Sequence, residues 1–394
     1  MIEQEGGIIT RRTILTQSSP ERAFLVAVTT KGSASGRSAE VSIDELAQLA
    51  GTAGANVVGR FVQRLPRPSR THYLGKGKLD ELLYLKDSKH YNVVIFDDEL
   101  SPLQQRNLEE ALQVKVIDRA ALILDIFARR AHTHEGQLQV ELAQHQYLLP
   151  RLAGQWSHLE RLGGGIGTRG PGESQLETDR RLMRQKIHHL KTRIEEVRKH
   201  RALYRQRRKK NGVPVIALVG YTNTGKSTLL SALARANVLV EDKLFATLDP
   251  TTRRLTLPDK STVLVTDTVG FIRKLPPTIV TAFRATLEEL AEARVLLHVV
   301  DLTAHNTPEH CQIVEDTLAE LNLTDKLRIT ALNKIDLLLD SGRAWDEEAA
   351  INYLPEQCKG MDANAVPISA SKGWGLSKLL ELISTTIIKK TQLI

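Results

Sequence analysis

The first third of the chain alternates short apolar runs with segments of helical period. Apolar runs of four to eight residues are typical of buried strands, and they lie at 23–30, 57–62, 93–96 and 114–117. Helical patterns separate them, at 43–50, 79–85 and 103–112. This alternation predicts a small α/β domain with a largely parallel sheet, which we place at residues 1–118.

The middle of the chain, 119–212, changes period. Apolar side chains recur at steps of four and three over 138–159 and again over 183–204, which predicts two long helices. Joined by a short link, they should pack as an antiparallel, coiled-coil-like hairpin. The glycine-rich link 163–172 is the predicted tip. Pro150 should bend the first helix, because proline removes a backbone donor and clashes with the preceding turn.

The last part, 213–394, returns to strand and helix alternation after the basic segment that ends at Lys210. Predicted strands lie at 213–219, 263–266, 295–300, 329–332 and 366–368. We therefore expect a second α/β domain here.

A phosphate-binding loop follows the first of these strands. It reads Gly220-Tyr221-Thr222-Asn223-Thr224-Gly225-Lys226-Ser227, and a helix begins with Thr228. Between a strand and a helix, such a loop wraps phosphates with its backbone amides at the positive end of the helix. Lys226 should reach the β- and γ-phosphates, and the Ser227 hydroxyl should bind Mg²⁺. A nucleoside triphosphate is the predicted ligand.

The base is indicated by Asn333-Lys334-Ile335-Asp336, directly after a strand. The carboxylate of Asp336 can accept two hydrogen bonds from guanine, whereas adenine would leave them unmade at about 1–3 kcal/mol each. Ser369-Ala370-Ser371, after the next strand, fits the loop whose backbone donates to the base oxygen. Guanine is the expected base.

Two further segments complete a Ras-like P-loop GTPase domain. Asp267 and Gly270, in Asp267-Thr268-Val269-Gly270, are expected to hold Mg²⁺ through water and to sense the γ-phosphate. Upstream, Phe245–Pro250 should close over the nucleotide with Thr247 on Mg²⁺, although Thr251 and Thr252 remain alternatives. We thus predict Lys226, Thr247 and Gly270 as the catalytic set, Ser227, Thr247 and Asp267 as the metal ligands, and Phe245 among the nucleotide contacts.

The residue after Gly270 is Phe271, where many G proteins have a glutamine that orients the attacking water. Intrinsic GTP hydrolysis should therefore be slow. Asn223 is a candidate to hold a monovalent cation such as K⁺ near the phosphates, and a turn-stabilising side chain is the alternative.

Charge and composition narrow the setting. Lys and Arg number 54 against 46 acids, giving +8 and a pI near 9.4, with basic residues dense over 180–210. A polyanionic partner suits this distribution. No apolar run is long enough to span a bilayer, and the first residues lack an export or import pattern, so we expect no membrane insertion and a cytoplasmic location.

These residues resemble the HflX GTPase family. The likeness includes the loop Tyr221–Ser227, Phe245–Pro250 and Asp267–Phe271, and outside the GTPase domain Leu74–Lys78, Phe96–Pro102 and Gly163–Arg181. It implies a GTPase that is stimulated by the ribosome, binds the large ribosomal subunit and its rRNA, acts on stalled ribosomes under stress and promotes subunit splitting.

By the same resemblance, the glycine tip points toward the peptidyl-transferase region. The candidate ribosome contacts are Gly165, Arg169, Arg180 and Arg181, and for the three arginines a solvated charged face is the alternative. We expect the chain to act as a monomer. It ends at Ile394, about one helix after Ser369, without the further small domain that some family members carry, so functions of that domain are not carried over.

Two other function classes remain open at this point. One is a signalling GTPase with a protein effector, which would leave the basic hairpin unexplained. The other is an ATP-dependent RNA remodeller that uses the first domain, where Gly75-Lys76-Gly77-Lys78 opens a helix and could bind phosphate. That second function would require ATP hydrolysis that survives Lys226→Ala.

Overall fold

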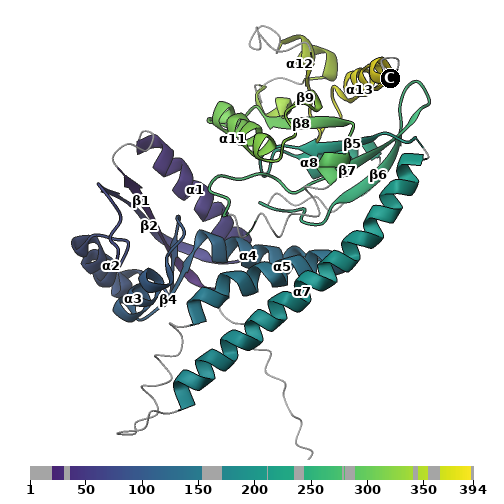
Figure 1. Ribbon diagram of the computed structural model, residues 1–394. Coiled ribbons are helices and arrows are strands. Elements are labelled where there is room, and N and C mark those ends of the chain that lie inside the picture. Colours follow the sequence, from purple (N-terminus) through teal and green to yellow (C-terminus); the bar gives the residue numbers. More distant parts are fainter. Residues whose placement is uncertain are drawn as a thin grey trace, which may run out of the picture.

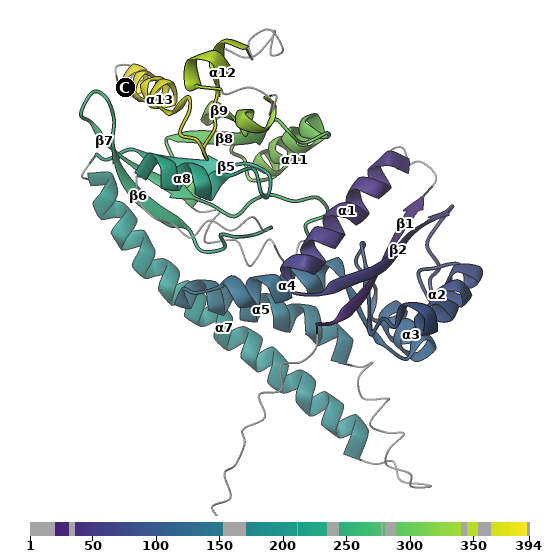
Figure 2. The ribbon, with the colours of Figure 1, turned by 180° about the vertical axis from the view of Figure 1, so that it is seen from behind.

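The computed structural model describes residues 20–30, 36–152, 171–210, 212–234, 244–276, 279, 289–339, 345–353 and 364–391. Figures 1 and 2 show three parts in chain order: an α/β unit, a pair of helices, and a second α/β unit. The long helix α7 runs beside α5, and its N-terminal end extends well past it.

The N-terminal unit has a four-stranded, fully parallel sheet in the order β2-β1-β3-β4. Its strands are β1 (Arg22–Thr30), β2 (Asn56–Leu65), β3 (Val93–Phe96) and β4 (Lys115–Asp118). Its helices are α1 (Gly36–Thr52), α2 (Lys76–Lys89), α3 (Pro102–Leu112) and α4 (Arg119–Arg130). The predicted parallel α/β arrangement is confirmed.

Alternation along the strands explains why helices cover both faces of this sheet. Leu25 and Ile95 point into a cluster with side chains of α1 and α4, whereas Phe24 and Val94 point into a cluster with α2 and α3. Successive side chains of a strand face opposite ways, so a strand that is apolar throughout needs cover on both sides.

The helical pair consists of α5 (His134–Leu148) and α7 (Pro171–Lys210). The packing is antiparallel, because Glu135 near the start of α5 pairs with Arg201 near the end of α7, and Glu141 pairs with Lys186. An apolar seam of Leu138, Leu142 and Leu190, flanked by Ile187, Ile194 and Val197, lies between the helices. The predicted hairpin stripes therefore do face each other.

Two details differ from the predicted hairpin. The α-helical part of the first limb ends at Leu148, and the chain continues as the 3₁₀ turn η1 (Leu149–Arg151) around Pro150, which cannot donate a backbone hydrogen bond. The second limb begins at Pro171, inside the predicted tip, because proline is favoured in the first turn of a helix. The rest of that tip lies outside the described residues.

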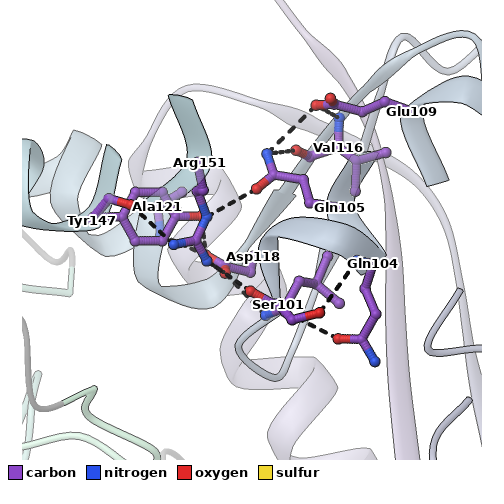
Figure 3. A network of polar contacts seen from close by, with 10 residues as sticks. Ser101, Gln104, Gln105, Glu109, Val116, Asp118, Ala121, Tyr147 and Arg151 are labelled. Carbon is purple, nitrogen blue, oxygen red and sulfur yellow. Dashed lines mark hydrogen bonds and ion pairs between the residues drawn. The ribbon is translucent and has the colours of Figure 1, made fainter. Parts of the chain in front are cut away.

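Arg151 fixes the base of the first limb to the N-terminal unit (Figure 3). Its guanidinium donates to Asp118 at 3.2 Å, to the Leu100 carbonyl at 2.7 Å and to Gln105 at 3.0 Å. It also lies 3.6 Å from the ring centroid of Tyr147, whose hydroxyl donates to Asp118. The polar contacts converge on one buried carboxylate, so the helical pair and the first sheet are joined at this point.

The second unit has a six-stranded sheet in the order β10-β9-β8-β5-β7-β6. Its strands are β5 (Val215–Val219), β6 (Thr251–Thr256), β7 (Thr262–Asp267), β8 (Val295–Asp301), β9 (Leu327–Asn333) and β10 (Ala365–Pro367). The short helices α12 (Glu347–Tyr353) and η2 (Ile335–Leu337) lie near its end. The sheet is parallel except for β6, which pairs antiparallel with β7 and was not predicted from the sequence.

Helices cover both faces of this second sheet as well. Side chains of α8 (Lys226–Ala234) and α13 (Leu376–Thr391) join one buried cluster, and those of α11 (Thr307–Glu320) join another. This is the arrangement of a Ras-like P-loop domain, as predicted. In the described part of the chain, no helix is both long and apolar enough to cross a bilayer.

The largest cluster of the N-terminal unit also contains side chains from the second unit. Leu244, Phe245 and Leu248 come from the segment before β6, and Val269 and Ile272 come from the segment after β7. The first segment includes Phe245–Pro250, which was predicted to close over the nucleotide, and the second includes Gly270, which was predicted to sense the γ-phosphate. Their apolar side chains are thus buried against the first domain, and this contact sets the orientation of the site.

Candidate active site

The predicted phosphate-binding loop runs from the end of β5 into α8. Gly225 has a φ of +90°, and a Cβ there would lie 2.4 Å from the Asn333 amide nitrogen, so a side chain is excluded. Thr224 closes the turn by donating to the Tyr221 carbonyl at 3.1 Å. Gly220 and Thr228 lie at the two ends of the loop, and Thr228 lines a cavity of about 40 Å³ above it.

Lys226 lies in the centre of this loop with its side chain buried. Its ammonium donates to the carbonyls of Gly220 at 3.2 Å and Tyr221 at 2.6 Å. Burial lowers the pKa of Lys226 to about 8, although the nearby Asp267 carboxylate opposes the shift. An anion such as a phosphate oxygen would restore the charged form.

The three predicted metal ligands meet at one point. Ser227 Oγ lies 2.6 Å from Asp267 Oδ2 and 2.7 Å from Thr247 Oγ1, and Thr247 donates to the same carboxylate oxygen at 2.9 Å. Burial raises the pKa of Asp267, because the ionised carboxylate is poorly solvated there. A bound cation would stabilise that ionised form. Two hydroxyls and a carboxylate are oxygen donors of the kind Mg²⁺ prefers, so the residues fit that ion. The alternatives Thr251 and Thr252 lie in β6 instead.

Gly270 lies directly against the phosphate-binding loop. A Cβ at this position would come within 2.7 Å of Thr222 Cα and 2.8 Å of the Lys226 ammonium, which only glycine avoids. The next residue, Phe271, exchanges backbone hydrogen bonds with the loop: Thr222 N donates to the Phe271 carbonyl at 2.8 Å, and Phe271 N to the Gly220 carbonyl at 3.1 Å. The Phe271 side chain is buried with Leu290 and Leu296, so it faces the core.

The residues predicted to recognise the base lie at the ends of β9 and β10. Asn333 is buried and bridges the site, because its amide donates to the Thr224 carbonyl at 2.8 Å and accepts from Ala370 N at 3.0 Å. Asp336 accepts from the Ser371 hydroxyl at 3.1 Å. Ser369, in the same loop, is buried, and its hydroxyl lies 3.1 Å from the hydroxyl of Ser371.

Lys334 has a φ of +67° and pairs with Asp301 at 2.7 Å. The structure therefore gathers the residues predicted to read guanine at one edge of the sheet, where the carboxyl ends of parallel strands meet.

Three family models match consecutive parts of the chain. They describe a GTP-binding GTPase N-terminal region at 40–128, a GTP-binding GTPase middle region at 130–208, and a 50S ribosome-binding GTPase at 215–334. The GTPase HflX of Caldanaerobacter subterraneus subsp. tengcongensis is 50% identical over 376 residues, which cover 95% of this chain and 82% of that one. The chain belongs to the HflX family of GTPases. The GTPase HflX of Escherichia coli K12 is 44% identical, over 87% of this chain and 78% of its own length.

As a member of the HflX family, the protein binds GTP and hydrolyses it to GDP and phosphate. The family assignment agrees with the order of the sequence motifs, and the convergence of Ser227, Thr247 and Asp267 gives the divalent cation of P-loop GTPases a place.

In this HflX-family protein, the phosphate end of the site also contacts the other domains. The Tyr221 side chain points away from the nucleotide position, donates to Glu45 of α1 and stacks on His310 with ring centroids 3.8 Å apart. Phe245 also lines the phosphate cavity, and its ring packs edge-to-face on Phe127 of α4 with ring centroids 4.9 Å apart. These two predicted nucleotide contacts thus have side chains committed to the domain interface.

Charged groups extend the same interface, and the sequence patterns missed them. Lys274 bridges Asp97 and Asp98, at 2.5 Å to each. The fully buried Arg119 pairs with Asp97 at 2.8 Å and with Glu45. Burial raises the pKa of Asp97, with Lys274 opposing the shift, and lowers that of Arg119 to about 10. An aspartate pair after a strand, as at 97–98, was the available signal, but nothing in the sequence names its distant partner.

Asp249, two residues after Thr247, reaches the helical pair. Its carboxylate accepts from the backbone of His132 and of Thr133, both at 2.8 Å, and from the Thr133 hydroxyl at 2.5 Å. Thr133 is the N-cap of α5. The segment that contains Thr247, the predicted metal ligand, is therefore hydrogen-bonded directly to the start of the hairpin.

The predicted ribosome contacts separate into two groups. Arg180 and Arg181 lie on α7, the first partly buried and the second exposed. Gly165 and Arg169 lie outside the described residues, as does most of the predicted tip.

Proposed function

We propose that this GTPase binds the large ribosomal subunit through its helical hairpin and uses GTP to split or rescue stalled ribosomes under stress. The observation that carries the proposal is the bond from Asp249 to the start of α5. It connects the γ-phosphate side of the GTP site with the element that would touch rRNA. Loss of the γ-phosphate would then change the position of the hairpin through this bond.

The charge of α7 supports the choice of a polyanion as partner. Its exposed basic side chains include Arg181, Arg184, Lys191 and Lys199. Lysine and arginine on one helix neutralise phosphates and release counterions, which gives binding without sequence specificity and a strong salt dependence. The glycine-rich segment 163–172 can approach RNA closely because it has few side chains.

Sedimentation with purified ribosomal subunits tests the proposal. The full chain should co-sediment with the large subunit in the presence of a non-hydrolysable GTP analogue, and less in GDP. The double variant Arg181→Glu/Arg184→Glu should lose binding, whereas Arg253→Glu/Arg254→Glu, an equal charge change on exposed residues of β6, should retain it. Equal loss in both variants would contradict a specific role of α7.

A deletion of residues 163–172 should abolish subunit splitting and leave GTP binding in solution unchanged. Splitting at the wild-type rate by the deleted chain would remove the tip from the mechanism. In this proposal the domains divide at 118/119 and 212/213, and the large subunit raises GTP turnover many-fold above a slow intrinsic rate.

The proposal includes K⁺ beside Mg²⁺. Asn223 has a φ of +60° and an exposed side chain next to the phosphate cavity, so its amide oxygen is available to a monovalent cation. GTP turnover should be faster in KCl than in NaCl, and Asn223→Ala should remove the difference. Equal rates in the two salts would leave Asn223 with the turn-stabilising role.

A further inference from the structure

The hydroxyl of Thr222 in the phosphate-binding loop is buried without a partner. The residue is 6% exposed, and no hydrogen bond to Thr222 Oγ1 is formed within the described part of the chain. Neighbouring hydroxyls of the same loop differ, since Thr224 Oγ1 donates to a carbonyl and Ser227 Oγ to Asp267. A buried polar atom left unpaired is unfavourable, so its retention points to a ligand.

The surroundings of Thr222 place this residue at the phosphate end of the site. Thr222 lines the cavity that Lys226, Thr247 and Gly270 also line. Its backbone is held by the Phe271 carbonyl, and its Cα and methyl lie within 2.7 and 3.0 Å of where a Gly270 side chain would begin. Thr222 thus lies between Lys226, which is predicted to bind the phosphates, and Gly270, which is predicted to contact the γ-phosphate.

A second pocket, of about 330 Å³, meets the loop at the same residue. It is lined by Thr222 and Asn223 together with Gln48 of α1 and His305. Thr222 and Asn223 therefore line both the larger pocket and the phosphate cavity.

The usual water-orienting side chain is missing from this site. Phe271 follows Gly270, its ring is buried in the core and its backbone is bonded to the loop. Thr222 lines the phosphate cavity together with Lys226 and Gly270, and its hydroxyl is buried and unpaired within the described part of the chain. That hydroxyl is therefore available for the role that the Phe271 side chain cannot perform.

We propose that Thr222 Oγ1 accepts a hydrogen bond from the attacking water and orients it toward the γ-phosphorus. In the reaction the water oxygen bonds to that phosphorus, and the bond from phosphorus to the β–γ bridging oxygen breaks. The water protons leave with the inorganic phosphate, and GDP keeps the bridging oxygen. Thr222 gains or loses no proton. It acts by position, which contributes to rate when the reacting atoms are held in line.

Single-turnover hydrolysis of GTP by the full chain tests the proposal. Thr222→Val keeps the shape and removes the hydroxyl, so the rate constant should fall about tenfold to a hundredfold, while the Kd for a non-hydrolysable GTP analogue changes less than about threefold. Thr222→Ser should restore at least about a third of the wild-type rate. Because the lost hydroxyl has no protein partner, the Val variant should unfold at the wild-type temperature or above.

Three outcomes would overturn the role of Thr222. They are an unchanged rate in Thr222→Val, a loss of GTP affinity that accounts for the whole effect, and a Ser variant as slow as the Val variant. None of these outcomes would contradict the assignment as a GTPase, because the same assay measures GTP hydrolysis by the wild-type chain. Thr252→Val, which removes a hydroxyl paired with Thr266 in the neighbouring strand and lies outside the phosphate cavity lining, should leave the rate unchanged.

Discussion

The two ends of the nucleotide site differ in what they touch. The base end, with Asn333, Asp336 and Ser371, makes its contacts within the GTPase domain. The phosphate end reaches both other parts of the chain, through Asp249 to the hairpin and Lys274 to the first sheet. Hydrolysis changes the phosphate end and leaves the base unchanged. A ligand can shift a conformation only by binding its states differently, so the connections lie where the ligand changes.

The largest expected effect tests the phosphate end itself. Thr247→Ala removes one of the three oxygens that converge with Ser227 and Asp267, so GTP turnover should fall at least a hundredfold. Thr252→Ala, a matched change in β6, should keep wild-type turnover in the same Mg²⁺-dependent assay. Equal loss in both variants would mean that the metal threonine has been placed wrongly.

A substitution at the base end should lower GTP affinity and GDP affinity alike. Asp336→Asn replaces two acceptors for guanine with an amide, and at about 1–3 kcal/mol per lost hydrogen bond GTP affinity should fall about a hundredfold. Xanthosine triphosphate, with an oxygen in place of the guanine amine, should bind the variant better than GTP does. GTP and GDP affinities, measured by calorimetry, should drop by the same factor. A changed ratio would show that the base end also communicates with the other domains.

A substitution at the contact between the GTPase domain and the first sheet should change the ratio of GTP to GDP affinity. Lys274→Ala removes the bridge to Asp97 and Asp98, but Asp97 keeps Arg119 and Ser42. Because Lys274 is 40% exposed, the loss of unfolding free energy should be modest, about 1 kcal/mol in urea. The ratio of GTP to GDP affinity should nevertheless shift, unlike in Asp336→Asn.

Lys115→Ala, which removes an exposed pair with Glu21, is the control for Lys274→Ala. It should leave both the unfolding free energy and the nucleotide ratio unchanged. An unaltered ratio in Lys274→Ala would mean that the contact holds the domains together without responding to the nucleotide.

Much of the fold could be predicted from local pattern. Each strand of the first sheet contains apolar residues that mark it in the sequence, and the stripe of Ile187, Leu190 and Ile194 lies on α7 facing α5. Strand β6 (Thr251–Thr256) was not predicted, because it exposes three consecutive residues and buries only Leu255, so no apolar run marks it in the sequence. Pairing with β7, a tertiary contact, makes it a strand.

Within the site, the short-range motifs could be predicted and the long-range partners could not. Ser227 and Asp267 follow strands whose carboxyl ends share an edge, so spacing along the chain was enough. Tyr221 and Phe245 were expected to contact nucleotide because they lie in the right loops. Their side chains contact Glu45 and Phe127, which are 176 residues and more than 100 residues distant in sequence. No local pattern encodes a contact of that range.

The smallest expected effect is a proton count, and it separates the two ends within one measurement. Burial lowers the pKa of Lys226 to about 8 in the free chain, and a triphosphate beside it favours the charged form and raises that pKa. At pH 9 the lysine is mostly neutral when free and charged when bound, so GTP binding should take up nearly one proton. At pH 6.5 it is charged in both states, and uptake should vanish.

Calorimetry in two buffers of different protonation enthalpy measures this number directly. Asp336→Asn should bind GTP more weakly at pH 9 yet take up the same number of protons per bound nucleotide, because the ammonium and the phosphates still meet in that variant. Heats that do not depend on the buffer at pH 9 would mean that Lys226 is already charged in the free chain. Uptake lost in Asp336→Asn would instead mean that the two ends are coupled, and the contrast between a self-contained base end and a connected phosphate end would fail.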